Sequence, residues 1–171
     1  MKILVIAPPR SGTGYAARCL QDMGLDVGHE RLGQNGISSW LWAVDCIDNA
    51  RWGDNYQDIR PDMVVMLMRN LFDHIASLAF TASNAFEWMG QYVEYDKQAP
   101  AHVQAAQLSA GWDDLALARK PDHVVATENF DMFCKREFDF APDPALKNYN
   151  ARKHRPLTRS ECEDVYAIYN S

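Results

Sequence analysis

The chain has 171 residues, of which 47% are hydrophobic and 23% are charged, a balance that is typical of a folded globular protein. This composition excludes a disordered chain, a collagen-like fibre and a coiled coil, and the length predicts one domain over residues 1–171. The formal net charge of −6 argues against general binding to nucleic acid, because an acidic surface repels phosphate polymers.

Nothing in the sequence predicts export or a membrane anchor. The apolar start, Ile3–Ala7, is interrupted by Pro8, which makes it too short for a signal peptide or a membrane span. Scattered cysteines without a CxxC pair are typical of reduced, buried thiols, and this chain has four: Cys19, Cys46, Cys134 and Cys162. We therefore expect a soluble, cytoplasmic protein with no membrane partner.

Predicted strands and helices alternate along the chain. Continuous apolar runs, as in strands that are buried on both faces, predict strands at Lys2–Ala7, Leu25–Gly28, Met63–Met68 and His123–Thr127. Apolar periodicity and capping signals predict helices at Thr13–Met23, Leu71–Ala82, His102–Lys120 and after Thr158. This alternation predicts a three-layer α/β fold, in which helices cover both faces of a mostly parallel sheet.

The loop after the first strand has the composition of a phosphate-binding turn. A strand, a glycine-bearing turn and a helix N-terminus bring backbone N–H groups and the positive end of a helix dipole together. Arg10 adds a guanidinium to this loop, and Ser11 and Thr13 add hydroxyl donors. In parallel sheets ligands bind beyond the carboxyl ends of the strands, so this loop is the first candidate site.

Two other nucleotide-binding motifs match the loop less well. It lacks the Gly-Lys-Ser/Thr that closes a Walker A motif, which argues against an ATPase or a GTPase. Gly12, Gly14 and Ala17 have the spacing of the dinucleotide fingerprint, and Glu30 follows Gly12 by 18 residues. Four residues separate the strand from Gly12, where that fingerprint has a tight turn. An NAD(P)-dependent Rossmann oxidoreductase is therefore the weaker alternative.

The third interpretation is a resemblance to a known family. The run Pro9-Arg10-Ser11-Gly12-Thr13 resembles the 5′-phosphosulfate-binding loop of sulfotransferases that use 3′-phosphoadenosine 5′-phosphosulfate (PAPS). Gly14 stands where that family has a second threonine. The resemblance implies a P-loop-type nucleotide-binding fold and a 5′-phosphosulfate held by Arg10, Ser11, Gly12, Thr13 and Gly14. Tyr15 is then either an adenine-stacking residue or a core aromatic.

A second match follows the third predicted strand. Arg69 and Asn70 end that strand, and Ser77 follows the arginine by eight residues. Sulfotransferases have a similar Arg-Asn or Arg-Asp and a serine eight residues on, and the resemblance implies that Arg69 and Ser77 hold the 3′-phosphate. Taken without the resemblance, Arg69 as a partner of Asp73 and Ser77 as a small spacer between helices are equally good interpretations.

Two further segments are weaker matches. Residues 147–159 hold five Lys or Arg and no Asp or Glu, which is typical of a solvated loop or of an anion lid. The family closes over the 3′-phosphate with a late Arg-Lys loop, and the resemblance assigns that place to Arg152 and Lys153. The end of the fourth predicted strand, Thr127-Glu128, resembles a family segment near the adenine.

Sulfuryl transfer requires positioning, stabilisation of negative charge and a base. Arg10 is placed to stabilise the charge. The resemblance puts the base at the end of the second predicted strand, where a glutamate serves some branches of the family and a histidine serves others. Glu30 is the first candidate and His29 the second; a salt bridge from Glu30 to Arg31 or Arg10 is the structural alternative. The histidines form no metal-binding pattern, so we expect no metal.

The resemblance extends from Ile3 to about Leu157 and implies a PAPS-dependent sulfotransferase acting on a hydroxyl or amine of a small molecule or a side chain. Trp40 and Trp42 either line the acceptor pocket or pack the core. Catalytic domains of that family are generally longer than this chain. A nucleotide-binding module without transfer activity is therefore the second interpretation.

Overall fold

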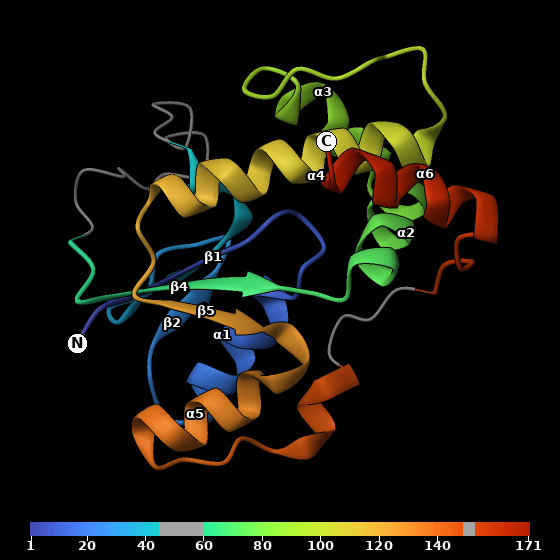
Figure 1. The fold of residues 1–171 in the computed structure, drawn as a ribbon. Helices are drawn as coiled ribbons and strands as arrows, with labels where there is room; N and C mark the ends of the chain where they lie inside the picture. Colours follow the sequence, from blue (N-terminus) through green and yellow to red (C-terminus); the bar gives the residue numbers. More distant parts are fainter. Residues whose placement is uncertain (45–59, 149–152) are drawn as a thin grey trace.

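The computed structural model describes residues 1–44, 60–148 and 153–171. Its centre is a five-stranded sheet with the strand order β2-β3-β1-β4-β5, and every pair of neighbouring strands is parallel. The strands are β1 (Ile3–Ile6), β2 (Val27–His29), β3 (Gly36–Ser38), β4 (Met63–Met68) and β5 (His123–Ala126). Because all strands run in one direction, their carboxyl ends meet at one edge of the sheet (Figure 1).

Helices cover both faces of this sheet (Figure 1). On one face lie α1 (Thr13–Asp22) and α5 (Phe130–Phe138). On the other lie α2 (Leu71–Thr81), α3 (Phe86–Met89), α4 (Ala101–Ala118) and α6 (Arg159–Tyr169). The predicted three-layer α/β fold is thereby confirmed. Within the described parts, no helix combines the length and the apolar character that a membrane span requires.

The two layers of helices bury two separate cores, and β1 contributes to both. Ile3 and Val5 pack with α1 and α5 in one core, whereas Leu4 and Ile6 pack with α2 and α4 in the other. Successive side chains of a strand point to opposite faces, so a central strand must be apolar at every position. This is the reason that the sequence indicates β1 so clearly.

The structure contains elements that the sequence did not predict, among them β3, α5 and the short helix α3. The short strand β3 lies between β2 and β1, in a segment for which no strand was predicted. Its first residue, Gly36, has φ 120° and would place a Cβ 1.9 Å from the carbonyl oxygen of Ile3, so only glycine allows this pairing. Helix α5 was also missed, although its buried residues Phe130, Phe133 and Cys134 have helical spacing.

The predicted capping residues are confirmed. Asn70 caps α2, because its side-chain oxygen accepts a hydrogen bond from the backbone N–H of Asp73 at 3.2 Å. Thr158 and Glu161 form a capping box at the start of α6, in which each side chain accepts a hydrogen bond from the other residue's backbone N–H. Of the cysteines, Cys46 lies outside the described residues, and the other three are free thiols.

Candidate functional site

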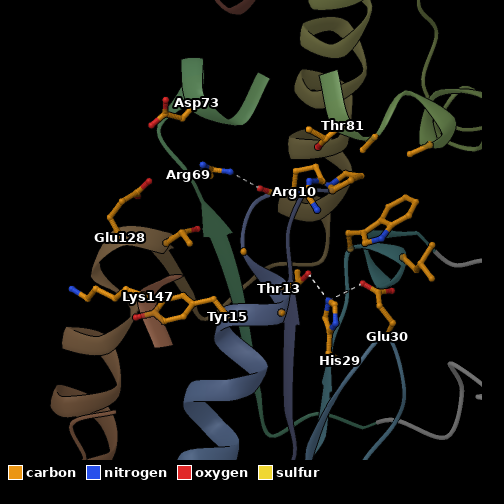
Figure 2. Close-up of a pocket in the computed structure, with 18 of the residues that line it drawn as sticks. Arg10, Thr13, Tyr15, His29, Glu30, Arg69, Asp73, Thr81, Glu128 and Lys147 are labelled. Atoms are coloured by element: carbon orange, nitrogen blue, oxygen red, sulfur yellow. Dashed lines mark hydrogen bonds and ion pairs between the residues drawn. The ribbon is translucent and has the colours of Figure 1, made fainter. Parts of the chain in front are cut away.

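A cavity of about 910 Å³ lies at the carboxyl edge of the sheet (Figure 2). Its walls include the β1–α1 loop, the end of β2, the end of β4 and the segment after β5. These are the four places that the sequence analysis identified as candidate sites. The residues that line it there are Pro9, Arg10, Gly12, Thr13, Gly14, Tyr15, His29, Glu30, Arg69, Thr127 and Glu128.

The β1–α1 loop has a backbone conformation that suits an anion. Arg10 and Gly12 are left-handed, with φ 71° and φ 98°, and Ser11 between them is not. Alternation of this kind turns successive N–H groups toward one side and forms an anion-binding concavity. Helix α1 begins directly after Gly12 with no side-chain cap, so the N–H groups of its first turn have no partner within the helix.

Residues distant in sequence support this loop from behind. The hydroxyl of Thr127 donates to the carbonyl oxygen of Ser11 at 2.6 Å. The Nε2 atom of His74 lies 2.9 Å from the carbonyl oxygen of Pro9, and because a carbonyl only accepts, Nε2 is the donor. The loop is therefore tied to β5 on one side and to α2 on the other.

Replacing Gly12 with alanine should destabilise the protein by at least about 1–2 kcal/mol, the usual cost of a left-handed non-glycine residue. A Cβ at this position would also lie 2.4 Å from Cγ2 of Thr127. Thermal unfolding measures the loss. Gly24→Ala is the matched control, since Gly24 has φ 83° but nothing within 4 Å of its Cβ position. An equal loss of stability in Gly12→Ala and Gly24→Ala would show that the contact with Thr127 does not add to the destabilisation.

The two arginines of the predicted anion sites meet at this loop. Nη1 of Arg69 donates to the carbonyl oxygen of Arg10 at 3.2 Å, as Figure 2 shows. No ion pair within 4.0 Å joins Arg69 to Asp73 in the described parts of the chain. The structure therefore brings the guanidinium of Arg69 to the β1–α1 loop, where both predicted anion sites border one cavity.

Ser77 occupies a different place from the one expected of a phosphate ligand. Its hydroxyl accepts a hydrogen bond from Nε of Arg10 at 3.3 Å, and the residue is only 1% exposed. Ser77 therefore orients the guanidinium of Arg10 from beneath the cavity wall. Ser77 would therefore affect an anion in the cavity only by holding the Arg10 side chain in place.

Of the described residues of the basic segment, Lys147 contributes a cation to the cavity. Lys147 lines the wall near Tyr15, and its Nζ atom pairs with Asp131 at 2.9 Å. Arg152, the predicted lid arginine, lies outside the described residues, and Lys153 is exposed. In the sequence, Lys147 is only the first residue of the basic run 147–159, and nothing in that run distinguishes it as a cavity residue.

Glu30 and His29 lie side by side at the end of β2 (Figure 2). Ser39 donates a hydrogen bond to Oε2 of Glu30 at 2.7 Å, and Nε2 of His29 lies 3.4 Å from its Oε1. On its other side, Nε2 of His29 lies 3.3 Å from the hydroxyl of Thr13. The predicted base is thus linked by contacts to the first turn of α1.

Burial changes the protonation of both members of this pair. It raises the pKa of Glu30 to about 7, and the hydrogen bonds from Ser39 and from the backbone of Trp40 oppose the rise only in part. Burial also lowers the pKa of His29. At neutral pH His29 is therefore mainly neutral, and Glu30 is divided between its two forms. A carboxyl with a pKa near the working pH is suited to accept a proton.

The glycine at position 14 accommodates His29. A Cβ on Gly14 would lie 3.3 Å from Cε1 of the His29 ring, which is closer than ordinary van der Waals contact. A threonine, the residue that the family loop has here, would carry this Cβ, so the ring would have to shift by a few tenths of an ångström. The departure from the family pattern is therefore linked to the histidine at the end of β2.

The aromatic candidates divide between cavity and core. Tyr15 is 7% exposed and packs edge-on against Phe130 at 6.2 Å, so it is a core aromatic with one edge in the cavity wall. Burial, with a contact to Cys19, holds the pKa of its hydroxyl well above the usual range. Trp40 lines the cavity and packs on Trp88 at 5.0 Å, whereas Trp42 is buried in the core.

No protein-family model, curated protein or solved structure matches this chain. The described residues contain no group of three or more His, Cys, Asp or Glu side chains arranged to hold a metal ion. The molecule is a three-layer α/β protein with a large cavity at the carboxyl edge of its parallel sheet.

Proposed function

We propose that this protein is a PAPS-dependent sulfotransferase, which transfers a sulfuryl group to a hydroxyl or amine acceptor. The proposal depends above all on the 3.2 Å hydrogen bond from Arg69 to the carbonyl oxygen of Arg10. This bond brings two arginine-bearing loops, 59 residues apart in sequence, to one cavity. Two neighbouring groups of cationic and N–H donors suit a ligand that carries a negative group at each end.

The residues at the cavity are compatible with such a nucleotide. Ser11, which the resemblance assigns to the phosphosulfate, is not among the residues that line the cavity; its covered hydroxyl has no hydrogen-bond partner among the described residues. The volume of about 910 Å³ lies within the range of pockets that enclose small organic ligands. Arg10, Gly12, Thr13 and Gly14 would hold the phosphosulfate end, and Arg69 and Lys147 would face the 3′-phosphate.

The bound nucleotide supplies an activated sulfuryl group, and the protein supplies the proton acceptor and the charge stabilisation. Glu30, as a carboxylate, takes the proton of the acceptor O–H or N–H. The acceptor atom bonds to sulfur while the bond between sulfur and the bridging phosphate oxygen breaks, and adenosine 3′,5′-bisphosphate leaves with that electron pair. Arg10 and the N–H groups of α1 stabilise the negative charge that develops on these oxygens.

The acceptor would bind beside Glu30. Besides the polar residues named above, the cavity wall includes the apolar side chains Trp40, Leu41, Ala82 and Ala85. Thr81 and Asn84 add polar groups to it. An acceptor with an apolar body would bury it here and present its hydroxyl or amine to Glu30.

Titration calorimetry with adenosine 3′,5′-bisphosphate tests the nucleotide assignment, and incubation with PAPS carrying radiolabelled sulfate tests transfer to a panel of acceptors. The proposal expects binding of the bisphosphate, weaker binding of adenosine 5′-monophosphate, and labelled product. Binding without transfer to any acceptor would favour a nucleotide-binding module. Stabilisation by NAD(H) alone would overturn the proposal in favour of an oxidoreductase.

A further inference from the structure

A line of buried and partly buried polar side chains runs from the C-terminal helix to the back of the β1–α1 loop. The hydroxyl of Tyr169 on α6 donates to Oγ of Ser109 on α4 at 3.0 Å. Oγ of Ser109 lies 3.3 Å from Nδ1 of His74 on α2, and Nε2 of that ring contacts the carbonyl oxygen of Pro9. At the far end, Oδ2 of Asp113 lies 3.4 Å from the Tyr169 hydroxyl.

The number of protons available fixes the direction of each hydrogen bond. The carbonyl of Pro9 only accepts, so Nε2 of His74 carries a proton. Burial, together with the nearby Arg69 and Arg10, lowers the pKa of His74 to about 4, so the ring is neutral and its Nδ1 accepts. The hydroxyl of Ser109 must therefore donate to Nδ1, and its oxygen accepts from Tyr169.

The single proton of the Tyr169 hydroxyl is then used in the hydrogen bond to Ser109, so Tyr169 cannot also donate to Asp113. The two oxygens, 3.4 Å apart, attract each other without loss elsewhere only when Asp113 is protonated and acts as the donor. If Asp113 is ionised, the proton of Tyr169 turns toward the carboxylate. Two arrangements are then open to Ser109. It can keep its hydrogen bond to His74 and accept none from Tyr169, or it can donate to Tyr169 instead. In the second arrangement Nδ1 of His74 has no proton donor.

We propose that Tyr169, Ser109 and His74 are positioning residues, which couple the protonation of Asp113 on α4 to the hold on the Pro9 carbonyl in the β1–α1 loop. Protonated Asp113 keeps every donor of the line directed toward the loop. Ionised Asp113 draws the proton of Tyr169 away; where Ser109 then donates to Tyr169, His74 takes the other tautomer, which cannot donate to Pro9. This coupling is a property of the folded protein and does not depend on which anion the loop binds.

The surroundings of Asp113 place this change near neutral pH. Burial raises the pKa of Asp113 to about 7; the hydrogen bond with Tyr169 lowers it and the neighbouring Asp114 raises it. The other acids of α6 near α4, Glu161 and Asp164, lie against His102 at 3.6 Å and 3.0 Å. On the side of α2, the line is flanked by the two arginines that act on His74.

The test is nitrogen-15 NMR of the His74 ring in the full chain between pH 5.5 and pH 8.5, which distinguishes the two tautomers directly. The proposal expects a change in the His74 nitrogen shifts with a midpoint near pH 7. Asp113→Asn should abolish that change, because an amide N–H donates at every pH, and Tyr169→Phe should also abolish it by cutting the line. Tyr166→Phe, one turn earlier in α6 and 62% exposed, should leave it as in the wild type.

Affinity for adenosine 3′,5′-bisphosphate provides a second measurement. It should fall about three- to tenfold more between pH 6 and pH 8 in the wild type than in Asp113→Asn, as expected from the loss of one hydrogen bond that supports the loop. A His74 signal that titrates identically in wild type, Asp113→Asn and Tyr169→Phe would overturn the inference. Absence of bisphosphate binding with an intact NMR titration would contradict only the proposed function.

Discussion

Replacing Glu30 with glutamine is expected to lower kcat for sulfuryl transfer about 100- to 10,000-fold, the usual contribution of a positioned general base. Glutamine has nearly the same shape and can still accept the hydrogen bond from Ser39, but it cannot take a proton. Transfer of labelled sulfate measures kcat, and calorimetry should show bisphosphate affinity within about twofold of the wild type. Glu163→Gln, an exposed site on α6, is the control. An unchanged kcat in Glu30→Gln would remove Glu30 from the mechanism.

The pH dependence of transfer gives an independent check on the same residue. Because burial raises the pKa of Glu30 to about 7, the active carboxylate form increases as the pH rises through 7, and kcat should rise with it. The Ser39 hydrogen bond lowers this pKa by stabilising the carboxylate. In Ser39→Ala the midpoint of the profile should therefore move to higher pH, while Glu30→Gln should show no rise at all.

Replacing Arg69 with alanine is expected to weaken bisphosphate binding about 10- to 150-fold, which corresponds to about 1.5–3 kcal/mol for a hydrogen bond to a charged group. The effect should be large because Asp73 and Glu128 line the same part of the wall. Without Arg69, the cations among the described lining residues are Arg10 and Lys147, and Lys147 already pairs with Asp131. The loss of the bond to the Arg10 carbonyl would also loosen the loop.

Calorimetry on three variants separates these contributions. Arg69→Lys keeps the charge but loses the planar fork of donors, so its affinity should lie between those of the wild type and Arg69→Ala. Arg159→Ala removes an arginine that is 94% exposed on α6 and should bind as tightly as the wild type. Equal affinity of Arg69→Ala and wild type would show that the two loops do not hold one nucleotide.

Of the four strands that the sequence predicted, the central strands β1 and β4 have the clearest apolar pattern. β1 and β4 are covered by helices on both faces, so burial requires apolar residues throughout and the pattern is visible from sequence alone. β3 has only three residues, including Gly36 and the buried Ser38. It is a strand because Gly36 allows a close approach to Ile3, which is a contact between segments and leaves no periodic pattern.

The same distinction applies to the cavity. The positions of Arg10, His29, Glu30 and Arg69 at one edge follow from the order of strands and loops, because parallel strands end at the same side of a sheet. Their roles follow from contacts that span the chain. The resemblance to sulfotransferases implied that Ser77 holds a phosphate, and the packing of α2 shows in addition that its hydroxyl accepts a hydrogen bond from Arg10.

The sequence thus indicated the α/β class, the central strands, the helix caps and the loops that surround the cavity, because local residue patterns and strand direction determine each of these. Only the tertiary structure shows the hydrogen bond from Ser39 to Glu30 and the one from Thr127 to the β1–α1 loop. The same is true of the line of hydrogen bonds from Tyr169 to Pro9. Hydrogen-bond direction and a shifted pKa depend on atoms brought together from distant parts of the chain. Burial, which supplies the low dielectric behind both effects, exists only in the packed molecule.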